Sequence, residues 1–195
     1  MPRWLDILLG RSRPAKPDLD ALFALPSAAV TLRAATGFAP TGTGSVCFRA
    51  VEGGAFATVE QDIRALLGVA GGPAIERVDD SYGYTWLVIR RAADDVSALV
   101  TDLHAANSSL EQAGFGPSLL CSLVAFADTS GRYGADRHVA LVYLYKQGTF
   151  YPFAPLGGQR RDNVLELQLR GVLADELPIE PDLSRWFPLW GAPGL

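Results

Sequence analysis

The sequence contains little of the chemistry on which most enzymes and metalloproteins depend. Two histidines and two cysteines occur among 195 residues, and each of the four stands apart from the others. No HxxxH or CxxC spacing marks a zinc site, and no G-x-S-x-G sequence marks a serine nucleophile. We therefore predict no catalytic residue, no cofactor and no metal, and we expect His104 and His138 to be structural.

Long apolar runs and a basic balance are also missing. No run approaches the roughly 20 apolar residues that span a bilayer, and Asp6 interrupts the short N-terminal run, unlike a signal peptide. The net charge of −4 differs from the basic balance of nucleic-acid-binding proteins. These features predict a cytoplasmic protein that binds no nucleic acid.

The two cysteines lie in separate segments that resemble strands. We expect Cys47 and Cys121 to be buried, reduced thiols, as in cytoplasmic proteins. A disulfide between them is the lesser alternative, because the sequence does not fix their distance.

The composition provides for a substantial core. About half of the residues are hydrophobic (49%) and 19% are charged, which argues against disorder. We divide the chain into a basic amphipathic N-terminal arm (1–16), a single α+β domain (17–180) and an aromatic, proline-rich C-terminal tail (181–195).

Hydrophobic periodicity, capping residues and breakers predict the order of the elements. The predicted helices cover 18–25, 58–67, 94–113 and 163–176. The predicted strands cover 28–34, 45–51, 74–78, 82–91, 119–127, 138–145 and 149–153. Consecutive strands followed by helices indicate hairpins in a mostly antiparallel sheet, with helices packed on one face. Both faces of strand 82–91 are apolar, which predicts a central position, whereas Pro152 restricts the last strand to an edge.

Several polar groups have both a structural and a chemical interpretation. The paired carboxylates Asp79–Asp80 and Asp94–Asp95 suit acid–base chemistry, but a turn and a helix N-terminus explain them more simply. Residues 42–45 (GTGS) form a turn before a strand rather than a phosphate-binding loop, since no lysine and no helix follow. Asn107 is expected on the buried face of the long helix, pinning it to a neighbouring loop.

Two aromatic-rich regions and the N-terminal arm are the candidate binding surfaces. The arm places apolar side chains beside basic ones, which favours either docking on the domain or an interfacial helix at an anionic membrane. The aromatic residues of the last hairpin and of the tail form either core or partner surface. The candidate partner-binding residues are Trp4, Leu5, Leu8, Arg11, Arg13, Tyr145, Phe150, Tyr151, Trp186 and Trp190.

Six stretches together resemble a known family. They are LDALFALPSAAVTL (19–32), GSVCFRAVEGGAFA (44–57), DSYGYTWLVIR (80–90), LVTDLHAANSSLEQAGFG (99–116), LVYLYKQGTFYPFAPL (141–156) and RWFPLWGAPGL (185–195). With these stretches the chain resembles the actinobacterial PspA-associated proteins of the PspAB family. In addition, the topology predicted for residues 82–153 is similar to YbjN and type III secretion chaperone-like folds.

The family resemblance implies a role in the phage-shock response, which protects the cell envelope through the membrane-remodelling protein PspA. We therefore expect a non-enzymatic accessory protein that binds PspA or its assembly, with a weak contact at the inner face of the cell membrane. The alternatives are a chaperone-like peptide-binding module and an enzyme with an unrecognised small-molecule site. An enzyme needs ionisable residues that converge in one cleft, whereas an adaptor needs an exposed apolar or edge surface. The oligomeric state is left open.

Overall fold

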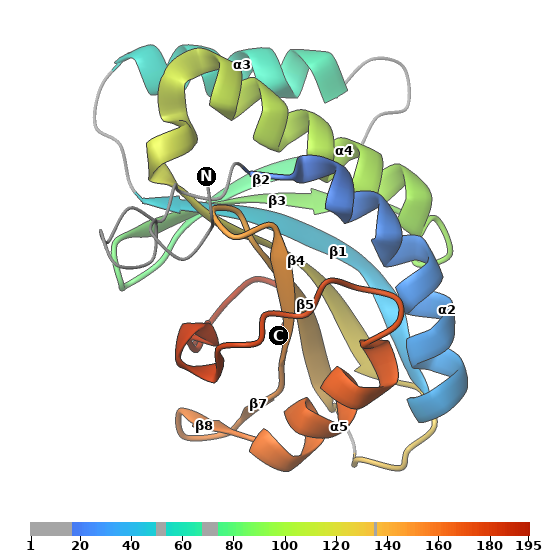
Figure 1. Cartoon of the computed structure of the whole chain (residues 1–195). Helices are drawn as coiled ribbons and strands as arrows, with labels where there is room; N and C mark the ends of the chain where they lie inside the picture. The colour runs from blue at the N-terminus through green and yellow to red at the C-terminus, as the bar shows by residue number, and fades with distance from the viewer. Residues whose placement is uncertain (1–16, 50–53, 68–73, 135) are drawn as a thin grey trace, which may run out of the picture.

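A computed structural model of the chain describes residues 17–49, 54–67, 74–134 and 136–195. The described residues form an antiparallel sheet of six strands in the order β2-β3-β1-β4-β5-β6 (Figure 1). The strands are β1 (Phe38–Arg49), β2 (Ala74–Asp79), β3 (Tyr84–Arg90), β4 (Leu119–Asp128), β5 (His138–Leu144) and β6 (Thr149–Phe153). A small separate hairpin joins β7 (Pro155–Leu156) and β8 (Arg160–Arg161). The predicted α+β class is therefore confirmed.

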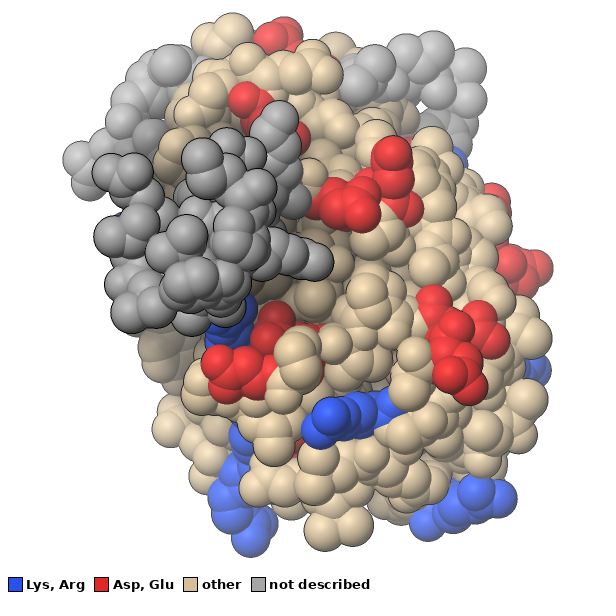
Figure 2. Space-filling view, viewed as in Figure 1, with Lys and Arg blue, Asp and Glu red and all other residues tan. Residues whose placement is uncertain are grey.

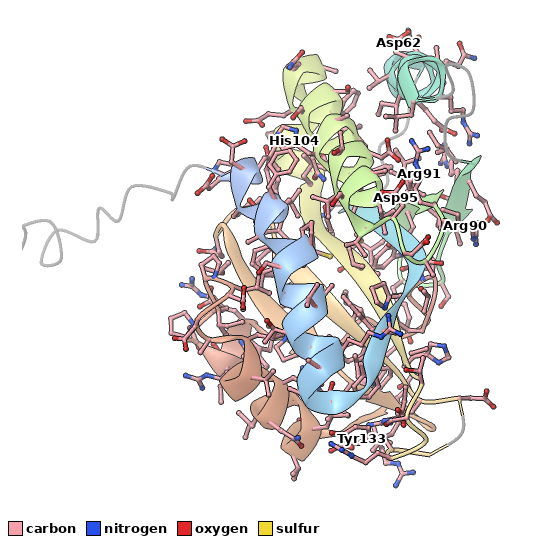
Figure 3. The ribbon with its side chains drawn as sticks, turned by 90° about the vertical axis from the view of Figure 1, so that its right-hand side faces the viewer. Asp62, Arg90, Arg91, Asp95, His104 and Tyr133 are labelled. Atoms are coloured by element: carbon pink, nitrogen blue, oxygen red, sulfur yellow. The ribbon has the colours of Figure 1, made fainter. Side chains whose placement is uncertain are left out.

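The helices gather on one face of the large sheet (Figures 1 and 3). They are the 3₁₀ helix η1 (Leu19–Ala24), α2 (Leu25–Thr36), α3 (Gly54–Leu67), α4 (Val96–Leu110) and α5 (Asn163–Leu173). A π-helical turn (Glu111–Phe115) and two short 3₁₀ turns, Gly116–Ser118 and Leu183–Arg185, complete the set. Leucines of α2, α4 and α5 and the inward side chains of the sheet share one hydrophobic cluster, so this face is the main core.

The long helix α4 follows its sequence signals closely. Asp95 caps its N-terminus by accepting a hydrogen bond from the Ala98 backbone N–H at 3.0 Å, one residue after the predicted cap. Gly114, with φ of +88°, ends the helical segment at the predicted place. Asn107 is fully buried and donates to the Ser122 hydroxyl at 2.8 Å, so it pins α4 to a strand of the sheet rather than to a loop.

One predicted strand is a helix. Residues 28–34, expected as a strand after a helix ending at Pro26, lie inside α2. Proline is tolerated in the first helical turn because the N–H groups of that turn have no acceptor within the helix, so the missing N–H of proline costs no hydrogen bond. Pro26 therefore lies at the start of a helix instead of ending one. Gly37, with φ of +89°, ends the helix, and β1 begins at Phe38, ahead of the predicted strand start at residue 45. Residues 42–45, predicted as a turn before a strand, therefore lie inside β1, and that prediction is wrong.

Two smaller differences concern element ends. Helix α3 begins at Gly54 rather than at the predicted capping residue Thr58. Asp162, not Asn163, caps α5 by accepting from the Leu165 backbone N–H at 3.0 Å. The one-residue difference at α5 falls within the usual uncertainty of helix boundaries, whereas the start of α3, four residues earlier than predicted, does not.

The C-terminal tail covers the second face of the sheet (Figure 1). Trp186 is buried and stacks on Tyr151 with ring centroids 5.8 Å apart. Its indole N–H donates to the Glu180 carbonyl at 3.0 Å. Trp190 is half-buried and packs edge-to-face against Phe153 at 5.3 Å. The tail therefore buries the apolar surface that the helices do not reach.

The outer edge of β6 is occupied by the chain itself. The Phe150 N–H donates to the Pro178 carbonyl at 2.8 Å, and the Glu180 N–H donates to the Phe150 carbonyl at 2.7 Å. Pro152 has no N–H, and the Ala154 N–H donates to a Glu166 carboxylate oxygen at 2.9 Å. Alternate residues of an edge strand direct their backbone groups outward, so none of these three positions offers a free donor.

The three aromatic residues of the last hairpin that were candidates for partner binding are buried inside the domain. Tyr145, Phe150 and Tyr151 are 3%, 0% and 0% exposed. Tyr145 and Phe150 belong to the helix-side core, and Tyr151 faces the tail. These side chains present almost no surface to a partner, and their contact with one stays a prediction.

Replacing Trp186 with alanine should destabilise the protein strongly, because the change removes a buried indole that anchors the tail. We expect a loss of about 3–5 kcal/mol in the free energy of unfolding, the usual cost of deleting a large core side chain. Leu183→Ala is the control, because Leu183 lies in the same segment but is 51% exposed, and it should cost about 0.5 kcal/mol or less. Urea denaturation measures both. Equal losses would mean that the tail is not anchored by Trp186.

Candidate functional site

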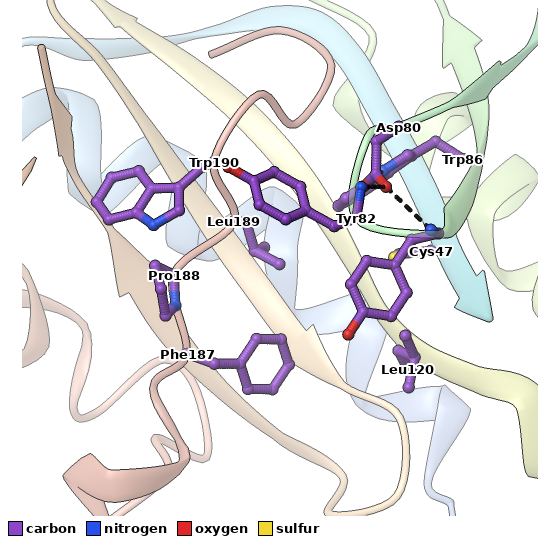
Figure 4. A pocket seen from close by; sticks show the side chains of 10 residues that line it. Cys47, Asp80, Tyr82, Trp86, Leu120, Phe187, Pro188, Leu189 and Trp190 are labelled. Carbon is purple, nitrogen blue, oxygen red and sulfur yellow. Dashed lines mark hydrogen bonds between the residues drawn. The ribbon is translucent and has the colours of Figure 1, made fainter. Parts of the chain in front are cut away.

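A cavity lies between the tail and the hairpin formed by β2 and β3 (Figure 4). Its volume is about 480 Å³, within the range of small-ligand pockets. The residues around it share an apolar or aromatic character with one exception, a carboxylate. They are Cys47, Asp80, Tyr82, Tyr84, Trp86, Leu120, Phe187, Pro188, Leu189 and Trp190.

The alternation of side chains along β3 places the hairpin residues in the wall of this cavity. Successive side chains of a strand point to opposite faces, so Tyr84 and Trp86 share the tail side of the sheet with Val88. Gly83, with φ of +84°, allows the tight turn that places Tyr82 at the tip. The predicted alternation of strand 82–91 is thus correct.

Asp80 holds the hairpin in shape. One of its carboxylate oxygens accepts from the backbone N–H of Tyr82 at 2.8 Å and of Tyr84 at 2.9 Å. The other oxygen accepts from the Trp86 indole N–H at 3.0 Å. The turn role expected for Asp80 is confirmed, and the same contacts place its negative charge in the wall of the cavity.

The rim of the cavity is aromatic and open to solvent. Tyr82 is 52% exposed, Tyr84 37% and Phe187 38%. The Tyr82 hydroxyl accepts a hydrogen bond from the Gln159 side-chain amide at 3.0 Å, which links the hairpin tip to the β7–β8 turn. Exposed rings that surround a concave apolar surface are typical of binding sites.

The cysteines lie at the base of this region. Cys47 and Cys121 are direct partners on the antiparallel strands β1 and β4, and both are buried, free thiols. The predicted burial is confirmed. The hydrogen bond with Cys121 and desolvation raise the pKa of the Cys47 thiol well above its ordinary value. A thiolate nucleophile is therefore disfavoured at Cys47.

A second, smaller hollow continues from the cavity along the tail. It has a volume of about 290 Å³ and shares Leu120 and Phe187 with the cavity. Leu144, Lys146, Gln147 and Arg185 complete its wall. The two hollows form a groove that extends from the β2–β3 hairpin toward the turn before β6.

Other polar candidates have structural partners elsewhere. His104 lies 3.3 Å from Asp20 and 4.9 Å from the Phe23 ring on the helical face (Figure 3). His138 contacts the Asp136 carbonyl at 2.9 Å, remote from His104. In the part of the chain that the structure describes, no group of three or more His, Cys, Asp or Glu residues could hold a metal ion.

Asp79, although adjacent to Asp80 in sequence, does not join it in the cavity. Its carboxylate accepts from the Thr85 hydroxyl at 2.6 Å and pairs with Arg77 at 3.2 Å. These interactions with Thr85 and Arg77 lower the pKa of Asp79, although desolvation opposes them. The two adjacent carboxylates therefore do not act as an acid–base pair.

Charged side chains are dispersed on the face shown in Figure 2. Acidic and basic groups of the described residues alternate there with large uncharged areas, and Lys and Arg do not gather in one patch. This face lacks the continuous basic surface that nucleic-acid recognition uses.

The structure brings few of the predicted binding residues together. Trp190 lines the cavity. Trp186, from the same tail, stacks on Tyr151. The arm residues Trp4, Leu5, Leu8, Arg11 and Arg13 lie outside the described residues.

Sequence reasoning missed that the hairpin belongs to the candidate site. The shared face of Tyr82, Tyr84 and Trp86 was a visible signal, but nothing local indicated that Phe187 would lie opposite.

A family model described as PspA associated protein B matches residues 2–194, which is nearly the whole chain. No curated protein and no solved structure matched in the same comparisons. The topological likeness to YbjN and secretion chaperones therefore stays a prediction. Among the residues that the structure describes, no helix combines the length and apolar character needed to cross a bilayer.

The cysteines should be inert in the native protein and reactive after unfolding. We expect no reaction of native protein with dithiobis(nitrobenzoic acid) at pH 8, because burial and the raised pKa of Cys47 suppress the thiolate. In guanidinium chloride both cysteines should react. Rapid native reaction would contradict their burial, and unreactive unfolded protein would reveal a disulfide.

Proposed function

The chain belongs to the PspA associated protein B family, and from that premise we propose that it is a non-enzymatic accessory protein of PspA. It acts by binding PspA or a PspA-containing assembly during the phage-shock response to envelope stress. The match over nearly the whole chain is the observation that carries the proposal, because the family description names PspA as the associated protein.

The aromatic cavity supports a binding role. Tyr82, Tyr84 and Phe187 leave ring surface in contact with water beside a concave apolar wall. Burying such surface against a partner is favourable at about 25 cal/mol per Å². Rigid aromatic side chains also lose little conformational entropy on binding.

The same cavity favours recognition over catalysis. Asp80 is the one formally charged residue in its wall, and its two oxygens hold backbone and indole donors of the hairpin. Catalysis of proton or group transfer usually needs several ionisable groups that converge on one point. An enzyme with an unrecognised site remains the alternative from another class, and detectable turnover by purified protein would favour it.

A chaperone-like role, in which an extended peptide lies along the groove, is the second alternative. The groove from the hairpin to Lys146 favours it, whereas strand addition at β6 is disfavoured because Phe150 is already paired. Binding of many unrelated peptides with similar affinity would favour this alternative over a dedicated PspA partner.

Affinity capture with the full chain as bait tests the proposal. Purified PspA should co-elute with the immobilised protein, and PspA should be enriched from cells under envelope stress. An unrelated immobilised protein of similar net charge is the control. If purified PspA, whether free or assembled, never binds the full chain, the proposal is wrong.

We place the protein in the cytoplasm, with a peripheral contact at the inner face of the cell membrane. The sequence of residues 1–16, which lie outside the described residues, carries four basic side chains against one acidic. Each basic residue adds about 1 kcal/mol of attraction to an anionic surface, and the apolar side chains Trp4, Leu5 and Leu8 suit insertion between headgroups.

Vesicle co-sedimentation tests this membrane contact. Binding to anionic vesicles should fall as salt rises, because counterions screen the basic residues. Leu8→Glu should weaken binding more than Arg11→Gln, because it removes apolar contact and adds a repelled charge. Neutral vesicles are the control. Equal sedimentation of wild type and Leu8→Glu, or sedimentation of neither, would remove the membrane contact.

A further inference from the structure

The cavity beside the β2–β3 hairpin combines one negative charge with several aromatic rings. Five of its ten wall residues are aromatic, and its single formal charge is the Asp80 carboxylate. The rings come from two segments, with Phe187 and Trp190 on the tail and Tyr82, Tyr84 and Trp86 on the hairpin (Figure 4). The faces of aromatic rings attract cations, most strongly when water is excluded.

The charge in the wall decides which ligands fit. A carboxylate has about four acceptor positions, and three donors of the hairpin occupy positions on Asp80. An anionic ligand would be repelled by Asp80, and a neutral apolar ligand would remove it from water without compensation. A cation with an apolar stem satisfies both the carboxylate and the rings.

We propose that this cavity receives an arginine side chain from a peptide segment of the protein partner. A guanidinium group stacks on aromatic faces and is weakly hydrated, so it enters such a site more readily than an ammonium group. The volume of about 480 Å³ accommodates the side chain. The adjoining hollow past Leu120 and Phe187 receives the neighbouring residues of the peptide. The assignment of this peptide to PspA rests on the proposed function.

A pair of small probes tests the cavity without any partner. Nα-benzoyl-L-arginine amide should bind the full-length protein and shift the indole N–H NMR signals of Trp86 and Trp190. The isosteric, uncharged Nα-benzoyl-L-citrulline amide should bind on the order of tenfold more weakly, because it lacks the cation. Equal binding of both probes would overturn the proposal.

Variants of the wall locate the binding. Phe187→Ala should weaken the arginine probe on the order of tenfold, whereas Phe23→Ala should leave it unchanged, since Phe23 is similarly exposed (49%) on the helical face. If both variants bind like the wild type, the probe binds elsewhere and the proposal is wrong.

Asp80→Asn tests the charge and has its own control. Asp128 also accepts backbone hydrogen bonds in a turn, from Ser130 and Tyr133, at the far end of β4 from Cys121. Asp80→Asn should weaken the arginine probe and not the citrulline probe, whereas Asp128→Asn should affect neither. If Asp80→Asn disturbs the hairpin, seen as changed backbone amide signals of Leu87 and Val88, which pair with β1 and not with Asp80, Phe187→Ala decides the matter.

Binding of purified PspA to the same variants tests the cavity proposal and the proposed function independently of each other. Weaker capture by Phe187→Ala, with Phe23→Ala unchanged, supports the peptide assignment. If PspA binds all variants equally, the cavity is not its docking site, although the proposed function stands. If PspA does not bind the wild-type protein, the proposed function is wrong. The probe titrations still decide whether the cavity binds a guanidinium group.

One further outcome concerns residues 1–16 of the chain itself. If Leu8→Glu in the full-length protein tightens binding of the arginine probe, this segment competes for the cavity. The occupant would then be the chain's own arm, and the assignment to a partner peptide would be overturned.

Discussion

The short backbone pairing between β6 and residues 178–180 determines where the last part of the chain goes. Phe150 donates to Pro178 and accepts from Glu180, so the chain leaves α5, passes the sheet edge and crosses to the face opposite the helices. Glu180 then accepts the Trp186 indole N–H. Without this pairing the second face of the sheet, including Tyr151 and Phe153, would be exposed to water at a large hydrophobic cost.

The same crossing creates the candidate site. The tail packs on β6 through Trp186 and Trp190, and a cavity remains between the tail and the β2–β3 hairpin, lined by Cys47 and Trp86. The β2–β3 hairpin closes the far side of that cavity through the hydrogen bonds of Asp80. A concave surface assembled from a turn and a tail, with aromatic rings and one carboxylate in its wall, is suited to holding a partner's side chain.

Local sequence signals predicted correctly those elements whose tertiary environment matches the local pattern. The alternation of Trp86 and Val88 with Leu87 and Ile89 identified a strand covered on both faces, and Gly114 marked the end of the long helix. Residues 28–34 were assigned wrongly because a short apolar run does not by its period separate helix from strand. In α2 the run is amphipathic, with Ala28, Ala29 and Leu32 buried and Val30 exposed. The cavity could not be predicted, because Asp80 and Phe187 meet only through the non-local pairing at β6.

The occupied outer edge of β6 also limits how this protein can associate with copies of itself. A sheet with two open edges can grow without end by adding strands, whereas a sheet with one open edge stops at a closed pair. In the described part of the chain, Phe150 and Ala154 have their outward N–H groups engaged and Pro152 has none. Edge-to-edge contact at those positions is blocked, which favours finite complexes over filaments at high local concentration.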